Sequence, residues 1–227
     1  RVLVLQSMVS VAIHSLNWPN ADRQLAEGQA SVFKHFGLPI KQHMARVDHG
    51  EWIDYVLKEA KEDTIIVVDN DCVPLKKEAV DKAVNWVTRN ESFLGMAQAS
   101  NHINNGRHVF AAPAFLAVNV KAWKKLGMPS SKANYRSDVA EELSWQAEEQ
   151  GLKYKAWYPT YYHHESEIEG LWKLGNYGHY GIGTVFADQV FHLYQGRCGL
   201  NVRLYTEVCK QIVNNTFSTE NYQSCIA

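Results

Sequence analysis

The chain has 227 residues, of which 46% are hydrophobic and 21% are charged, and its formal net charge is −1. This length supports one large core, and the near-neutral charge excludes binding to nucleic acid or to an anionic membrane through overall charge. No apolar run approaches the roughly 18 to 20 residues that span a bilayer, so we expect no transmembrane segment. The chain does not begin with Met, which leaves open an anchor upstream of Arg1.

The four cysteines, Cys72, Cys198, Cys209 and Cys225, form no CxxC pair and are few for this length. They predict free thiols in a reducing compartment, and therefore a cytoplasmic protein. A disulfide among the last three is the alternative.

Strand and helix patterns alternate through the first half of the chain. In order, they predict a strand at 2–13, a helix at 20–37, a short segment at 38–47, a helix at 51–63, a strand from 64, a helix at 76–90 and a strand at 92–100. This order predicts an α/β fold made of βαβ units, with a mainly parallel sheet and ligands at the carboxyl ends of its strands.

The second half is less regular. The segment 113–127 predicts a strand that runs into a short helix, and 137–151 predicts a longer helix. For that helix, Ser137 is the expected N-cap, Glu141 lies in the first turn and Gly151 follows the end.

Aromatic residues, histidines and glycines dominate the chain from Trp157 onward. We expect the segments 158–167 and 170–183 to be loops around a site rather than core. The sequence shows no linker or repeat, which favours a single domain over 1–227.

The buried strand that starts at Thr64 ends in Asp69-Asn70-Asp71. Two carboxylates at the end of a strand can hold a hard divalent cation such as Mg²⁺ or Mn²⁺ together with substrate phosphates. The alternative is a turn before Pro74 in which the Asp and Asn side chains accept hydrogen bonds from backbone amides.

Four segments resemble, in the same order, pieces of the DxD-containing glycosyltransferases of the GT-A fold, including members like family 2. They are IIVVDNDCVPL, FAAPAFLAVNVKAWKKLG, YRSDVAEELSWQAEEQGLKYKAWYP and GTVFADQVFHLYQGR. The resemblance covers Val2 to Arg197. It implies a GT-A-like, Rossmann-like mixed sheet flanked by helices, with a nucleotide-binding half at 1–100 and an acceptor or catalytic half at 101–227 that ends in a C-terminal acceptor-side lobe.

The resemblance also implies roles for individual residues. In the nucleotide-sugar site, Asp69 would face the ribose, Asp71 would bind a metal ion that bridges both phosphates, and Asn70 would lie between them. His192 would be a further metal ligand, while Gln195 stands where these enzymes often have a second histidine. The alternatives to that ligand are His163 and His164.

The same resemblance implies where the base of the nucleotide and the acceptor bind. The segment 10–17 would be the loop that holds the nucleotide base, with Val11 and His14 as its contacts. Asp138 would be the base that deprotonates an acceptor hydroxyl, with Glu141 as the fallback. The expected activity is therefore metal-dependent, inverting transfer of a sugar from a nucleotide diphosphate, most simply UDP, to a hydroxyl acceptor.

Three other functions each fit part of this sequence. Asp69 would be the nucleophile of a haloacid-dehalogenase-like phosphatase, although two crossover units precede it and the chain has no Asp-Asp pair. The run His163-His164-Glu165 offers zinc ligands, but without an HExxH motif. The seven tryptophans and eleven tyrosines also suit a sugar-binding module without catalysis.

Overall fold

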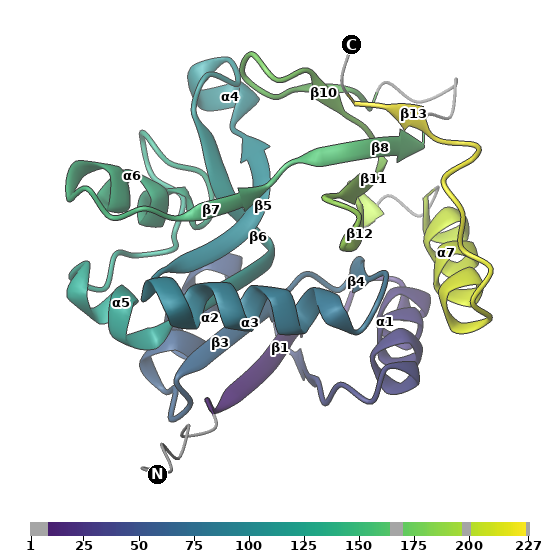
Figure 1. Ribbon diagram of the computed structural model, residues 1–227, viewed down its shortest axis with the longest axis horizontal. Helices are drawn as coiled ribbons and strands as arrows, with labels where there is room; N and C mark the ends of the chain where they lie inside the picture. The colour runs from purple at the N-terminus through teal and green to yellow at the C-terminus, as the bar shows by residue number, and fades with distance from the viewer. Residues whose placement is uncertain (1–8, 164–169, 197–200, 226–227) are drawn as a thin grey trace, which may run out of the picture.

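The computed structural model describes residues 9–163, 170–196 and 201–225 (Figure 1). Its strands are β1 (Val11–Asn17), β2 (Lys41–Met44), β3 (Thr64–Val68), β4 (Cys72–Pro74), β5 (Phe93–Ala99), β6 (Val109–Asn119), β7 (Lys155–Trp157), β8 (Pro159–His163), β9 (Trp172–Lys173), β10 (His179–Tyr180), β11 (Gly183–Phe186), β12 (Val190–Leu193) and β13 (Gln223–Ser224). Its helices are α1 (Arg23–His35), α2 (His49–Lys58), α3 (Glu78–Asn90), α4 (Asn101–Asn104), α5 (Val120–Lys125), α6 (Glu141–Glu149) and α7 (Val202–Val213).

The central sheet has six strands in the order β2-β1-β3-β6-β5-β7. β1 pairs in parallel with β2 and β3, β5 pairs in parallel with β7, and β6 runs antiparallel to both β3 and β5. The sheet is therefore mixed but mainly parallel, as the sequence predicts.

Helices cover both faces of this sheet, and Figure 1 shows α3 in front of it and α2 behind. Successive side chains of a strand point to opposite faces. In β3, Ile66 and Val68 accordingly join a cluster with α1 and α3, whereas Ile65 and Val67 join a cluster with α2, α5 and α6. This explains why β3 is an unbroken run of buried β-branched residues.

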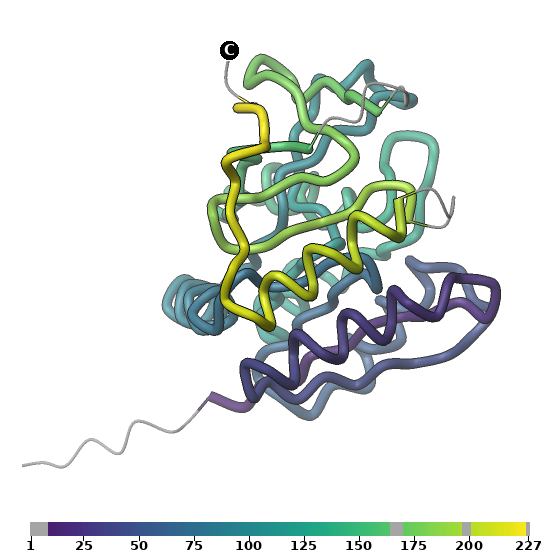
Figure 2. The backbone as a smooth tube through the Cα atoms, turned by 90° about the vertical axis from the view of Figure 1, so that its right-hand side faces the viewer, coloured from purple at the N-terminus to yellow at the C-terminus, as the bar shows by residue number. Residues whose placement is uncertain are grey.

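A second sheet of five antiparallel strands follows the order β13-β8-β11-β12-β4. Helices α1 and α7 pack on each other and against this sheet through a third apolar cluster, and Figure 2 shows the two helices side by side. β4 joins this second sheet directly after β3 leaves the first, so the acidic turn at 69–71 connects the two sheets.

The structure corrects two expected loops. Most of the described part of 158–167 is strand β8, and 170–183 contains β9 and β10 and reaches the first residue of β11. Tyr180, which we expected in a loop, is only 2% exposed. Tyr180 belongs to the same apolar cluster as residues of β5, β6 and β12, so this part of 170–183 is core. None of the described residues of 158–163 and 170–183 lines the acidic cleft described below.

Part of the expected first strand, at 2–8, lies outside the described residues, and the long helix of the second half begins later than expected. The segment 10–17 is not a loop, because nearly all of it is β1. Helix α6 begins at Glu141, and its N-cap is Ala140 with φ 63° rather than Ser137. The hydroxyl of Ser137 instead donates a hydrogen bond to Oε2 of Glu142 at 2.8 Å, so it satisfies a side chain and not the helix backbone.

The cysteines within the described residues, Cys72, Cys209 and Cys225, are buried free thiols, as expected. Cys198 lies outside the described residues. Within the described ranges, no helix is both long and apolar enough to cross a membrane.

Candidate metal and catalytic site

The turn from Asp69 to Cys72 is built around backbone oxygens that buried side chains satisfy. The N–H of Cys72 donates to the carbonyl of Asp69 at 3.0 Å and closes the turn. Nε2 of Gln29, a fully buried residue of α1, donates to the carbonyls of Asp69 at 2.6 Å and Cys72 at 3.0 Å. The hydroxyl of Tyr205 on α7 donates to the carbonyl of Asn70 at 3.1 Å. These contacts fix the backbone that carries both carboxylates.

Pairing between β4 and β12 brings His192 to the same turn. His192 is opposite Cys72 in the register, and the N–H of Leu193 donates to the carbonyl of Asp71 at 2.9 Å. Nε2 of His192 then lies 3.3 Å from Oδ1 of Asp71 and 4.0 Å from Oδ2 of Asp69. Among the described residues, Asp69, Asp71 and His192 form a group whose ligand atoms all lie within 4.8 Å of one another.

These donors fit a divalent metal ion. Two carboxylates and one neutral imidazole suit Mn²⁺, and they leave room in its coordination shell for substrate oxygens and water. Nδ1 of His192 is buried without a hydrogen-bond partner among the described residues, and Nε2 faces the acids. A closely spaced pair of carboxylates is itself a region of repulsion that a cation relieves.

His49 is a further contact of the acidic turn that sequence reasoning missed. Its Nε2 lies 3.2 Å from Oδ1 of Asp69, and its ring packs against those of Trp18 and Trp52. His49 is the first residue of α2 and follows the carboxyl end of β2 after a connection at 45–48, and ligands of an α/β sheet bind at this end of the strands.

The acids lie in a cleft of about 500 Å³. Its lining includes Asp69, Asp71, His192, Tyr194, Gln195, Gly196, His49, Gln98, Phe110, Pro113, Ala114, Asp138 and Val139. The hydroxyl of Tyr194 is buried and has no partner among the described residues, so it is a group that a ligand in the cleft could satisfy.

Asp138 reaches this cleft from the chain before α6. Its Oδ2 accepts a hydrogen bond from the hydroxyl of Ser100 at 3.2 Å, and its Oδ1 accepts one from the N–H of Val139 at 2.8 Å. Asp138 is half-buried. A carboxylate held by two donors in this way has a defined direction and keeps lone pairs for a proton.

Glu141 does not line the cleft. It is fully buried, and its Oε2 accepts the N–H of Asp138 at 2.7 Å while its Oε1 lies 2.5 Å from Nδ1 of His108. Nε2 of His108 lies 3.2 Å from Oε1 of Glu148. Burial lowers the pKa of His108, but the hydrogen bonds to these two carboxylates outweigh burial and raise that pKa above 6.5. Glu141 therefore positions the backbone of Asp138, and the geometry does not support it as the fallback base.

The remaining sequence candidates lie elsewhere. Val11 is opposite Thr64, at the start of β3 and far along the strand from Asp69. His14 lies within β1, with its Nδ1 2.9 Å from Nε2 of His43, and burial and then His43 lower its pKa to about 4. Because 11–17 is strand, the loop at the carboxyl end of β1 starts at Trp18 instead.

The alternative metal ligands lie in different places. Gln195 lines the cleft with φ 59°. His163, on β8, contacts Tyr222 and lines a separate cavity on the side of α7. His164 and Glu165 lie outside the described residues.

Comparisons with known proteins identify similar solved structures at low sequence identity. No family model and no curated protein matches this chain. Similar solved structures include the mannosyltransferase PcManGT from Pyrobaculum calidifontis in complex with GDP-Man and Mn²⁺ (10% identity, 66% of this chain and 55% of that chain, TM-score 0.48). TarS residues 1–349 from S. aureus in complex with UDP-GlcNAc is another (12% identity, 61% and 53%, TM-score 0.39).

A third similar structure is 4-diphosphocytidyl-2C-methyl-D-erythritol synthase from Anaerococcus prevotii (12% identity, 66% and 89%, TM-score 0.43). The chain spans about half the length of the mannosyltransferase and of TarS 1–349. The sequence identities to these structures are only 10% to 12%, so the function of this chain has to follow from the residues of its cleft.

Replacing His192 tests the metal site directly. We expect His192→Ala to weaken Mn²⁺ binding about tenfold or more, because one of three protein ligands is lost. His163→Ala, which removes an imidazole outside the cluster, is the matched control and should bind Mn²⁺ like the unchanged protein. Isothermal titration with Mn²⁺ measures both, and a larger loss in His163→Ala would contradict the assignment.

Gly196 offers a second test, in which none of the proposed ligands is replaced. A Cβ added at this position would lie 2.6 Å from Oδ2 of Asp71, too close for both atoms to stay where they are. We expect Gly196→Ala to displace the carboxylate and weaken Mn²⁺ binding, with little change in melting temperature. Unchanged Mn²⁺ affinity would show that Oδ2 of Asp71 is not needed for the metal.

The contact between His108 and Glu141 predicts a pH dependence of stability. The pKa of His108 is raised in the folded state, so the charged imidazole stabilises the fold fully below its unfolded pKa, and this contribution is lost as pH rises through the folded pKa. We expect His108→Gln to lower the melting temperature more at about pH 6 than at about pH 9. His35→Gln, at an exposed histidine, is the control, and an equal loss at both pH values would contradict the ionised pair.

Proposed function

We propose that the protein is a metal-dependent glycosyltransferase that moves a sugar from a nucleotide diphosphate, in the first instance UDP, to a hydroxyl acceptor with inversion. The observation that carries this proposal is the meeting of Asp69, Asp71 and His192 in a cleft that also contains the carboxylate of Asp138. Asp69, Asp71 and His192 suit a divalent cation that binds substrate phosphates, and Asp138 is a separate carboxylate that can accept a proton.

Asp69, Asp71 and His192 are the residues that would hold the metal ion. When bound, a divalent cation supplies positive charge that stabilises a departing diphosphate. The buried hydrogen bonds of Gln29 and Tyr205 hold the turn, so its carboxylates are oriented before substrate arrives.

Asp138 is the proposed base. It would accept the proton of the acceptor hydroxyl as that oxygen attacks the anomeric carbon, while Ser100 and the N–H of Val139 hold the carboxylate in direction. Glu141 acts through the backbone of Asp138 and contacts no substrate in this scheme.

The experiment starts with a screen of nucleotide sugars by thermal shift, with Mn²⁺ and with EDTA, because a ligand that binds the native state raises the melting temperature. UDP-sugars and GDP-sugars both belong in the screen. The donor found there is then tested with hydroxyl acceptors, and NMR of the product reports the anomeric configuration. Asp71→Ala should abolish the Mn²⁺ dependence of donor binding.

For Asp138→Asn we expect transfer to fall by about 10² to 10⁴-fold, because a general base contributes about that much. Affinity for the donor and melting temperature should change little, since the amide keeps the shape and an acceptor oxygen. Near-normal transfer by Asp138→Asn would rule out Asp138 as the base and would favour a mechanism that retains the anomeric configuration.

The same measurements separate the other functions. Donor or sugar binding without any turnover would favour a sugar-binding module. Release of phosphate from a phosphomonoester that Asp69→Asn abolishes would favour the phosphatase instead.

A further inference from the structure

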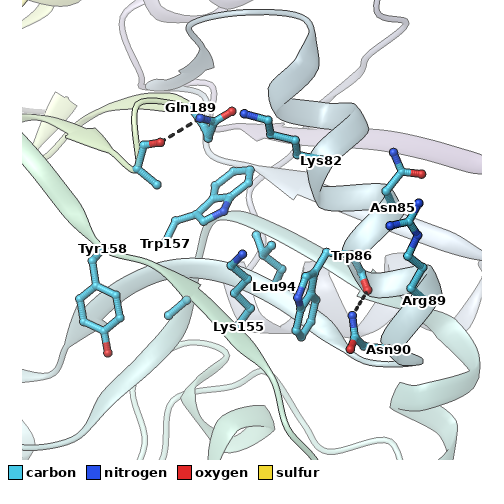
Figure 3. Close-up of a pocket in the computed structure, with 12 residues that line it drawn as sticks. Lys82, Asn85, Trp86, Arg89, Asn90, Leu94, Lys155, Trp157, Tyr158 and Gln189 are labelled. Atoms are coloured by element: carbon cyan, nitrogen blue, oxygen red, sulfur yellow. Dashed lines mark hydrogen bonds between the residues drawn. The ribbon is translucent and has the colours of Figure 1, made fainter.

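A second cavity lies apart from the acidic cleft. A groove of about 710 Å³ lies between α3, the edge strand β7 and the turn before β12, and it shares no lining residue with the cleft (Figure 3). Its charged lining side chains are cationic, whereas the cleft contains carboxylates. The function proposed above assigns no role to this groove.

Positive charge in this groove has no matching negative charge. Lys82, Arg89 and Lys155 line it, and no carboxylate is among the described lining residues. Within the described part of the chain, none of these three side chains forms an ion pair of 4.0 Å or less. Since Lys82 and Arg89 are on α3 and Lys155 is on β7, the cations border the groove from two sides, which favours an anionic ligand.

The groove also contains a buried hydrogen-bond acceptor without a donor. Gln189 is only 7% exposed, and its Nε2 donates to the carbonyl of Ala187 at 2.9 Å. Its Oε1 has no partner among the described residues. Figure 3 shows Gln189 at the same end of the groove as Lys82. An unpaired buried oxygen is costly, so this position favours a ligand with an O–H or N–H to donate.

An aromatic face completes the lining. Trp86 on α3 is partly exposed, and Figure 3 shows its indole beside Lys155. Trp157, by contrast, stacks on Phe115 at 5.3 Å between ring centroids and belongs to the core. The ring of Trp86 can pack against the apolar face of a flat, partly polar ligand.

We propose that this groove binds an acidic saccharide, meaning a sugar that carries a carboxylate, sulfate or phosphate group. Such a ligand has an anion for the cations, hydroxyl donors for Oε1 of Gln189 and an apolar ring face for Trp86. A neutral sugar would leave the cations unused. The linkages of a phosphodiester backbone would satisfy the cations but offer no donor to Gln189, so a nucleic acid would reach Oε1 of Gln189 only through a ribose hydroxyl or a base. Binding here does not depend on the proposed transfer reaction.

The test is a titration of the full chain with the tetrasaccharide of galacturonic acid, followed by calorimetry and tryptophan fluorescence. We expect saturable binding at low salt that weakens as salt rises. Arg89→Gln and Lys155→Gln should each weaken it about tenfold, because each removes a charge-assisted hydrogen bond. Lys124→Gln, at an exposed lysine of α5 outside the groove, is the matched control and should have no effect.

A neutral tetrasaccharide of galactose and an oligouridylate of similar length are the competing ligands. The proposal is overturned if either binds as tightly as the acidic tetrasaccharide, if no binding is detected, or if Lys124→Gln weakens binding as much as Lys155→Gln. Asp71→Ala should bind the acidic tetrasaccharide unchanged. That result separates the groove from the metal site, so a failure of one proposal leaves the other standing.

Discussion

The passage of the chain from one sheet to the other, through the turn Asp69–Cys72, is the constraint on which the candidate site depends. β3 ends in the six-stranded sheet and β4 starts in the five-stranded sheet, so the carboxylates lie where the two sheets meet. The register of β4 and β12 then decides whether the imidazole of His192 faces the acids. A slip of one residue would turn His192 to the opposite face, and the three ligands would no longer converge.

The first sheet was predictable because its elements have long and distinct patterns. β3 is an unbroken apolar run, and the flanking helices are 10 and 13 residues long with one buried face each. The second sheet was missed because its strands have two to five residues, too few for alternation to be recognised. The predicted strand at 2–13 ends too early. β1 extends to Asn17 through the buried polar residues Ser15 and Asn17, which a pattern of apolar residues does not mark.

Contacts between side chains that are distant in the sequence could not be predicted from the sequence. His49 and Asp69 lie on different elements, and only the sheet brings them together. Glu141 has the position of an exposed first-turn carboxylate, yet it is fully buried because His108, 33 residues earlier, packs against it. The motif at 69–71 could be found because neighbouring residues compose it. A contact between distant residues leaves no such local pattern.

The net charge of −1 conceals a separation of charge that only the fold reveals. Carboxylates gather with histidines in the cleft, whereas lysine and arginine side chains without ion pairs within the described residues border the groove beside β7. The acids of the cleft repel an anionic ligand unless a cation neutralises them, but the groove attracts one at any metal concentration. An acidic saccharide therefore has a reason to prefer the groove, while a diphosphate has a reason to enter the cleft only together with its metal ion. Charge by itself draws both anions to the groove, so the preference of a diphosphate for the cleft comes from the metal ion. The preference of an acidic saccharide for the groove comes from Gln189 and Trp86 as well as from the cations.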